Sequence, residues 1–135
     1  MIRLLESATG RKEAEGACLY ASILLSQTLN RFTPHRAQVR GGGPPLAGGF
    51  LDRTGQLRGH YWVEVATSTE AGAGPASFIV DITADQFGEE PVLILPVDIA
   101  REHYIAGDQS RIDMHVAEEM AEIRSRTHQA SGPYL

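Results

Sequence analysis

The chain has a single cysteine, Cys18, among its 135 residues. An internal disulfide and a zinc site built from several cysteines are therefore excluded. No apolar run approaches the roughly 20 residues that a membrane-spanning helix needs, and Glu6 places an acid too early for a signal peptide. We therefore expect a protein without a membrane partner that is located in the cytoplasm, with export by a signal-independent route left open.

An excess of basic residues is also lacking. The 12 lysines and arginines stand against 17 aspartates and glutamates, which gives a formal net charge of −5. A protein that binds nucleic-acid phosphates is expected to carry a basic stripe instead. The run Gly41-Gly42-Gly43 lacks the lysine and the helix of a phosphate-binding loop. We expect no nucleic-acid partner, and the length favours one domain over residues 1–135.

Hydrophobic periodicity predicts two long helices and several short strands. Apolar residues at three- and four-residue spacing indicate helices over 11–30 and 111–127. Alternating patterns and apolar runs between turn residues predict strands, of which the second and third are expected to pair antiparallel. The expected strands lie at 37–40, 60–66, 77–83 and 92–95.

The segments between these elements are expected to be irregular. Residues 41–49 are rich in glycine and proline, so they are predicted to form a loop that cannot hold regular structure, either a flap over a cleft or a plain surface loop. Residues 98–106 are expected to form a helical turn or two. Residues 129–135 are predicted to be a frayed tail.

Three residues along the chain have the side chains of a thiol triad. Cys18 lies near the start of the first predicted helix, His60 opens one strand and Asp81 lies in the next. A cysteine nucleophile needs a base to remove its proton, and the imidazole needs a third group that fixes its tautomer. If Gly16 delays the start of the helix, the helix dipole would favour a thiolate at Cys18.

At these residues the chain resembles a known family. The order Gly-Ala-Cys on a helix, then His-Tyr-Trp-Val-Glu-Val, then Ile-Val-Asp-Ile-Thr is similar to the transglutaminase-like branch of the papain-like cysteine hydrolases. The resemblance covers roughly residues 14–87. It implies Cys18 as the nucleophile, His60 as the base and acid, and Asp81 as the residue that orients His60.

The expected fold class is α+β with a papain/transglutaminase-like core. The cysteine-bearing helix would pack on a mostly antiparallel sheet, which the C-terminal helix would cover. The expected function is thiol-dependent acyl transfer or hydrolysis of an amide in a protein or peptide, without a cofactor. Protease, glutamine deamidase and transglutaminase activities remain open, because water or an amine can resolve an acyl-enzyme.

The donors of an oxyanion hole are less clear. Many members of the family carry tryptophan beside the nucleophile, whereas Ala17 and Leu19 flank Cys18 here. The backbone N–H of Cys18 is the default donor. The weaker candidates for oxyanion or substrate contacts are Trp62, Gln86, Tyr20 and Gln38.

Two alternatives compete with catalysis. A lone cysteine on an apolar helical stripe is usually a small buried hydrophobe, which leaves a catalytically inactive hydrolase fold that serves in binding or assembly. The apolar stripe of the C-terminal helix leaves a homodimer open. No metal site is predicted, because Cys18, His60 and Asp81 supply only three ligands and the remaining histidines lack helical ligand spacing.

Overall fold

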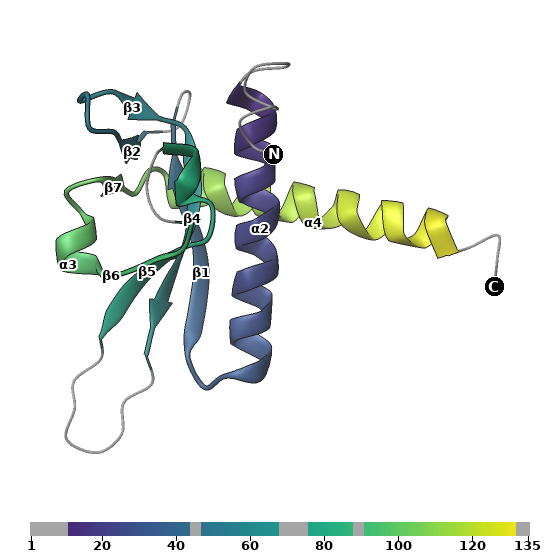
Figure 1. Cartoon of the computed structure of the whole chain (residues 1–135). Coiled ribbons are helices and arrows are strands. Elements are labelled where there is room, and N and C mark those ends of the chain that lie inside the picture. The colour runs from purple at the N-terminus through teal and green to yellow at the C-terminus, as the bar shows by residue number, and fades with distance from the viewer. Residues whose placement is uncertain (1–10, 44–46, 68–75, 88–90, 132–135) are drawn as a thin grey trace.

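The computed structural model describes residues 11–43, 47–67, 76–87 and 91–131. Within them the fold is α+β, as the sequence predicts. Figure 1 shows the long helix α2 standing beside a sheet, a second long helix, α4, crossing α2, and a small group of short strands at one end of the larger sheet.

The helix that bears the cysteine is α2 (Arg11–Phe32), close to the predicted span of 11–30. It covers strands β1 and β4 of the larger sheet. It ends where the Thr33 hydroxyl donates a hydrogen bond to the Leu29 carbonyl at 2.6 Å, just before Pro34, which cannot continue a helix. The buried stripe of α2 has three- and four-residue spacing and consists of Cys18, Leu19, Ser22, Ile23 and Ser26.

The larger sheet contains four antiparallel strands in the order β1-β4-β5-β6. The predicted antiparallel pairing of the second and third strands is confirmed, because β4 pairs with β5 from Val63↔Val80 to Ala66↔Ser77. The strands are β1 (Arg36–Gly42), β4 (His60–Ala66), β5 (Ser77–Asp81) and β6 (Leu93–Pro96).

The outer edge of β1 is closed by side chains. The Asn30 amide donates to the Ala37 carbonyl at 2.9 Å, and its oxygen accepts the Ala37 N–H at 2.7 Å. The Gln109 amide donates to the Val39 carbonyl at 2.9 Å. Backbone groups that would otherwise template another strand are therefore satisfied from α2 and α4.

The prediction of an irregular loop over 41–49 is wrong at both ends. Gly42 closes β1 and pairs with His60, while Gly49 opens β2. A Cβ on Gly42 would lie 2.2 Å from the Gly49 nitrogen, so the two backbones approach more closely than any side chain allows. Here the glycines permit close approach inside a sheet rather than breaking it. Residues 44–46 lie outside the described residues.

A second, three-stranded sheet has the order β3-β2-β7. It consists of β2 (Gly49–Leu51), β3 (Leu57–Arg58) and β7 (Tyr104–Ile105). The expected helical turn at 98–106 is confirmed only at its start, as α3 (Val97–Ala100), because the chain then pairs with β2. A strand of two residues is too short to produce a hydrophobic pattern.

Two clusters of buried side chains form the core. Cys18 belongs to the cluster between α2, β1, β4 and α4, whereas Trp62 belongs to the cluster between the two sheets and α3. The first consists of Cys18, Leu19, Ile23, Val39, Tyr61 and Ile112. The second consists of Phe50, Trp62, Ile79, Val97, Ala100 and Tyr104.

The C-terminal helix covers the sheet less than predicted. α4 (Gln109–Ser131) begins where the Asp108 carboxylate accepts the Ser110 N–H at 3.0 Å. Ile112 is fully buried, but Figure 1 shows the rest of α4 extending past α2. The helix continues through Ser131, beyond the predicted end at residue 127, and residues 132–135 of the predicted tail lie outside the described residues.

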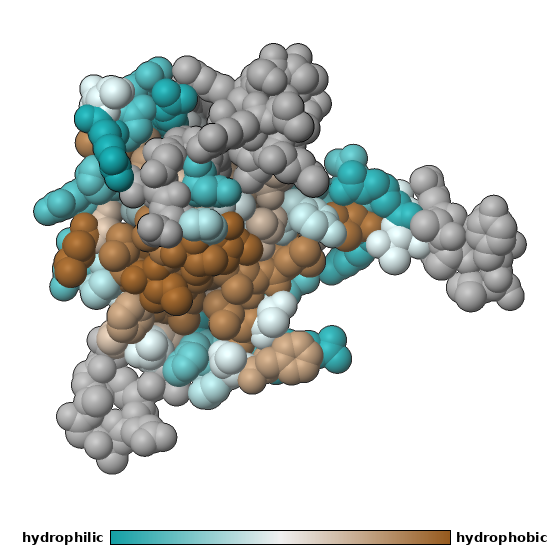
Figure 2. All heavy atoms as spheres, in the orientation of Figure 1, coloured by the Kyte–Doolittle hydropathy of each residue, from teal (hydrophilic) through white to brown (hydrophobic). Residues whose placement is uncertain are grey.

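An apolar surface lies beside α2. Figure 2 shows it over the larger sheet in the view of Figure 1. A surface of this kind is typical of contact sites. Among the described residues, no helix combines the length and apolar character needed to cross a bilayer. The large exposed apolar residues on α2 are Tyr20, Leu24 and Phe32, and those on or next to β5 and β6 are Ile82, Val92 and Ile94.

The close approach at Gly42 predicts a large cost for a single methyl group. Gly42→Ala should lower the free energy of unfolding by about 1–3 kcal/mol or more, because backbone atoms must move apart. Urea unfolding measures the change. The control is Gly55→Asn, since a Cβ at Gly55 meets nothing within 4 Å and asparagine tolerates its positive φ of 84°. Equal stability of the two variants would contradict the account.

Candidate active site

Cys18, His60 and Asp81 converge from three elements. Cys18 lies on α2, His60 is the first residue of β4 and Asp81 is the last residue of β5. The exposed fractions of the three residues are 0%, 0% and 1%. All three are therefore inside the protein, where unpaired polar groups are costly.

His60 and Asp81 form a short hydrogen bond. The imidazole Nε2–H donates to Asp81 Oδ2 at 2.7 Å. The expected contact between the two residues exists, but they do not stand opposite each other in the ladder. The paired residues of β4 and β5 end at Val63↔Val80, so Asp81 reaches His60 diagonally, past the end of the paired region.

The Asp81 carboxylate receives hydrogen bonds on both oxygens. The Thr83 N–H and hydroxyl donate to Oδ1 at 2.9 and 3.2 Å. The Tyr104 hydroxyl donates to Oδ2 at 2.7 Å, on the same oxygen as His60. Four donors therefore surround this buried charge, and burial of a carboxylate requires such partners.

The Cys18 side chain interacts with His60, because its hydrogen-bonding and charge effects contribute to the raised pKa of the imidazole. Because Nε2 of the imidazole faces Asp81, Nδ1 is the nitrogen left for the thiol. Burial lowers the pKa of His60, but the hydrogen bonds and charges of Asp81 and Cys18 outweigh it and raise the pKa to about 9. The raised pKa of His60 favours the cationic imidazole beside the Asp81 carboxylate.

The pKa of Asp81 is shifted downward, which complements the raised pKa of His60. Burial raises the pKa of Asp81, but the hydrogen bond and charge of His60, with the bonds from Tyr104 and Thr83, lower it below the ordinary value. Asp81 therefore stays ionised beside a protonated His60 at neutral pH. The pair fixes which imidazole nitrogen faces the thiol, as a base in this position requires.

Cys18 lies deeper in its helix than it would if Gly16 had delayed the helix start. α2 begins at Arg11 despite Gly16, so Cys18 is the eighth residue, past the first turn in which the helix dipole acts most strongly. Only the first four N–H groups of a helix lack an intrahelical acceptor. The position of Cys18 inside the helix places its N–H within the intrahelical ladder, which counts against it as an oxyanion donor.

Aromatic rings surround His60 on the side away from α2. Phe50 lies edge-on to the imidazole with centroids 6.0 Å apart, and Trp62 lies 6.0 Å away. Trp62 is buried, so it packs in the core beside the site. Its Nε1 has no hydrogen-bond partner in the part of the chain that the structure describes.

The remaining weak candidates lie elsewhere. Tyr20 lies on α2 and is 41% exposed. Gln38 pairs with Glu64, four residues along β4 from His60, about 13 Å away. The side chain of Gln86, in the short 3-10 helix Ala84–Phe87, lies outside what the structure describes.

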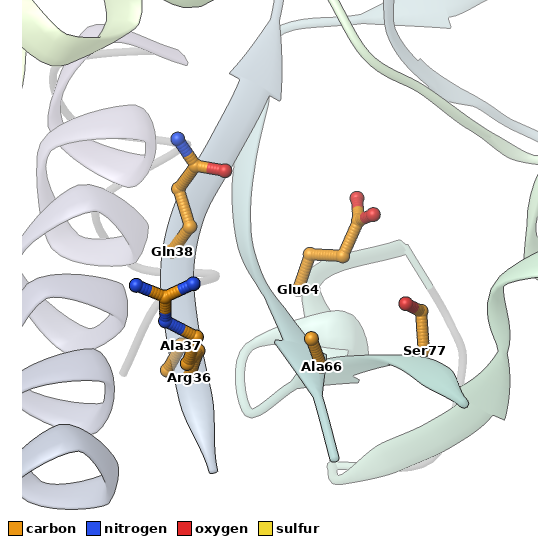
Figure 3. A pocket seen from close by; sticks show the side chains of 6 residues that line it. All are labelled: Arg36, Ala37, Gln38, Glu64, Ala66 and Ser77. Carbon is orange, nitrogen blue, oxygen red and sulfur yellow. The ribbon is translucent and has the colours of Figure 1, made fainter. Parts of the chain in front are cut away.

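Gln38 lines a groove that lies away from Cys18, His60 and Asp81. The groove has a volume of about 410 Å³, and Figure 3 shows Gln38 and Glu64 on the same side of their strands. Arg40 contacts Glu64 with 3.8 Å between Nη1 and Oε2. The groove residues are Arg36, Ala37, Gln38, Glu64, Ala66 and Ser77.

The sequence analysis missed Tyr104 and gave Thr83 no role. Thr83 follows Asp81 by two residues, the spacing at which an aspartate accepts a nearby N–H, so a local signal existed. No local pattern reveals Tyr104, because β2 brings it to Asp81 through the pair Phe50↔Tyr104.

Comparisons with protein-family models, with curated proteins and with solved structures find no match. The described residues contain no group of three or more histidine, cysteine, aspartate or glutamate side chains placed to hold a metal ion. The geometry and chemistry of the site therefore carry the functional argument.

The ion pair predicts how stability depends on pH. The contribution of His60 is full below its unfolded pKa of about 6.5 and is lost as pH rises to about 9. The contribution of Asp81 is full above 3.8 and is lost as pH falls through its lowered pKa. Urea unfolding should show a maximum between these limits and an alkaline loss on the order of 3 kcal/mol.

Two variants separate this loss from other titrations. His60→Gln should remove the alkaline loss between pH 6.5 and 9. His103→Gln should keep it, because exposed His103 bonds to the Leu51 carbonyl, away from the pair. An alkaline loss that is unchanged in His60→Gln would refute the assignment.

Proposed function

We propose that the protein carries out thiol-dependent acyl transfer or hydrolysis of an amide. The observation that supports this most strongly is the position of His60, which is hydrogen-bonded to the Asp81 carboxylate and whose pKa is raised by both Asp81 and Cys18. A nucleophile, a base and a group that orients the base are the parts that such chemistry requires.

In this mechanism the thiol proton already rests on His60, and the Cys18 thiolate attacks the carbonyl carbon of the amide. The tetrahedral intermediate collapses when His60 returns the proton to the departing amine, which leaves a thioester on Cys18. Water or a second amine then attacks the thioester as His60 takes its proton. The thiol is regenerated, and Asp81 stays ionised throughout.

The substrate class is an amide of a protein or peptide. The resemblance to the transglutaminase-like branch motivates this, and a cysteine-bearing helix against an antiparallel sheet is compatible with a papain-like core. Hydrolysis needs water at the thioester, whereas transfer needs an amine and a site that excludes water. The proposal therefore includes protease, glutamine deamidase and transglutaminase chemistry.

One observation favours a second function. Cys18 is 0% exposed, and its N–H is engaged within α2. A thiol without access to substrate fits a hydrolase fold that is retained for binding or assembly. The two functions differ in one measurable property, which is the reactivity of the Cys18 thiol in the folded protein.

Alkylation of Cys18 by iodoacetamide distinguishes these functions, because the chain has no other cysteine to react. For an enzyme, the rate of alkylation should stay high below pH 7 in the wild type. In His60→Ala this rate should fall below pH 7, because no imidazolium stabilises the thiolate. Asp81→Asn is the conservative second variant if His60→Ala does not fold. His103→Ala is the matched control and should label like the wild type.

The binding or assembly function predicts the opposite. Labelling would then be slower than that of a free cysteine at every pH, would not depend on His60, and would accelerate with urea in parallel with unfolding. That result would reject catalysis by Cys18 without contradicting the fold described above.

A further inference from the structure

We propose that Tyr104 is a positioning residue that holds the Asp81 carboxylate in place for His60. This inference deepens the proposed function and rests on it for its catalytic meaning. Tyr104 acts through Asp81, because its hydroxyl donates to Asp81 Oδ2 at 2.7 Å. The same oxygen accepts His60 Nε2–H, also at 2.7 Å.

The packing around Tyr104 fixes where its hydroxyl points. Its ring lies edge-on to both Phe50 and Trp62, with centroids 5.1 Å apart in each case. The residue is 3% exposed, and its backbone is held by the pair Phe50↔Tyr104 between β2 and β7. A buried ring between two others has little rotational freedom, so the hydroxyl is preorganised.

The hydroxyl completes a set of four donors around the carboxylate. Thr83 supplies two of them to Oδ1, while His60 and Tyr104 supply one each to Oδ2. The other groups facing Asp81 are therefore the imidazole and the Thr83 hydroxyl and N–H. Without Tyr104, Oδ2 would lose one of these two donors, while Thr83 would still hold Oδ1.

Holding Asp81 in this way has a chemical consequence. A buried carboxylate with fewer donors binds a proton more tightly. Asp81 would then compete with the imidazole for the shared proton, and His60 would lose its fixed orientation toward Cys18. Tyr104 thus keeps Asp81 as an ionised acceptor and leaves the proton on His60.

Tyr104→Phe tests this assignment because it removes the hydroxyl and keeps the ring. We expect Asp81 to bind its proton about tenfold more tightly, since a hydrogen bond to a charged group is lost. The ¹³Cγ resonance of Asp81, followed by NMR over acid pH, measures this change. Lost packing alone would not produce it.

Tyr61→Phe is the matched control. Tyr61 is also buried and its hydroxyl bonds to His115 Nδ1 at 2.8 Å, on the other side of β4 from Asp81. This variant loses a comparable hydrogen bond and should leave the Asp81 titration unchanged. An Asp81 titration in Tyr104→Phe that equals the wild type would overturn the proposal.

A second measurement needs no variant. In the wild-type protein the ¹³Cζ resonance of Tyr104 should follow the protonation of Asp81, and a resonance insensitive to that titration would also overturn the proposal. Neither readout depends on activity. An unreactive Cys18 would reject the proposed catalysis but leave the role of Tyr104 at Asp81 standing, so the two failures are distinguishable.

Discussion

The hydrogen bond between His60 and Asp81 is the constraint on which the rest of the site depends. Both groups are almost completely buried, and two ions inside a protein are tolerated only when good geometry and further hydrogen bonds compensate for lost solvation. Thr83, Tyr104 and the Cys18 thiol supply those bonds. A hydrophobic core of the same volume would be easier to build, so the charge is the feature that calls for a functional explanation.

The small sheet explains how a domain of this size completes the site. Its strands are two or three residues long, yet they carry Phe50 and Tyr104 to the side of His60 that faces away from α2. Gly42 lets β2 approach the end of β1 at the point where His60 is paired. The irregular-looking glycine segment is therefore what allows the second half of the site to form.

The elements that bear Cys18, His60 and Asp81 could be predicted from the sequence, because each is long enough to show a local hydrophobic pattern. Periodicity located α2 and the strands that bear His60 and Asp81, because a helix and an alternating strand each leave a signal over many residues. It could not locate Tyr104, whose strand is too short to alternate and whose partner is 54 residues earlier, at Phe50. The predicted helix start at residue 11 is confirmed, because a glycine within a helix costs only about 1 kcal/mol and Gly16 did not delay it.

The central claim is that His60 is a cation held between Asp81 and Cys18, and the most direct test is an NMR titration of its imidazole nitrogens. The account predicts an imidazole that stays protonated until about pH 9, and whose pKa falls in Asp81→Asn because the anionic partner is lost. An imidazole that is neutral at pH 7 in the wild type, or that titrates identically in Asp81→Asn, would contradict it.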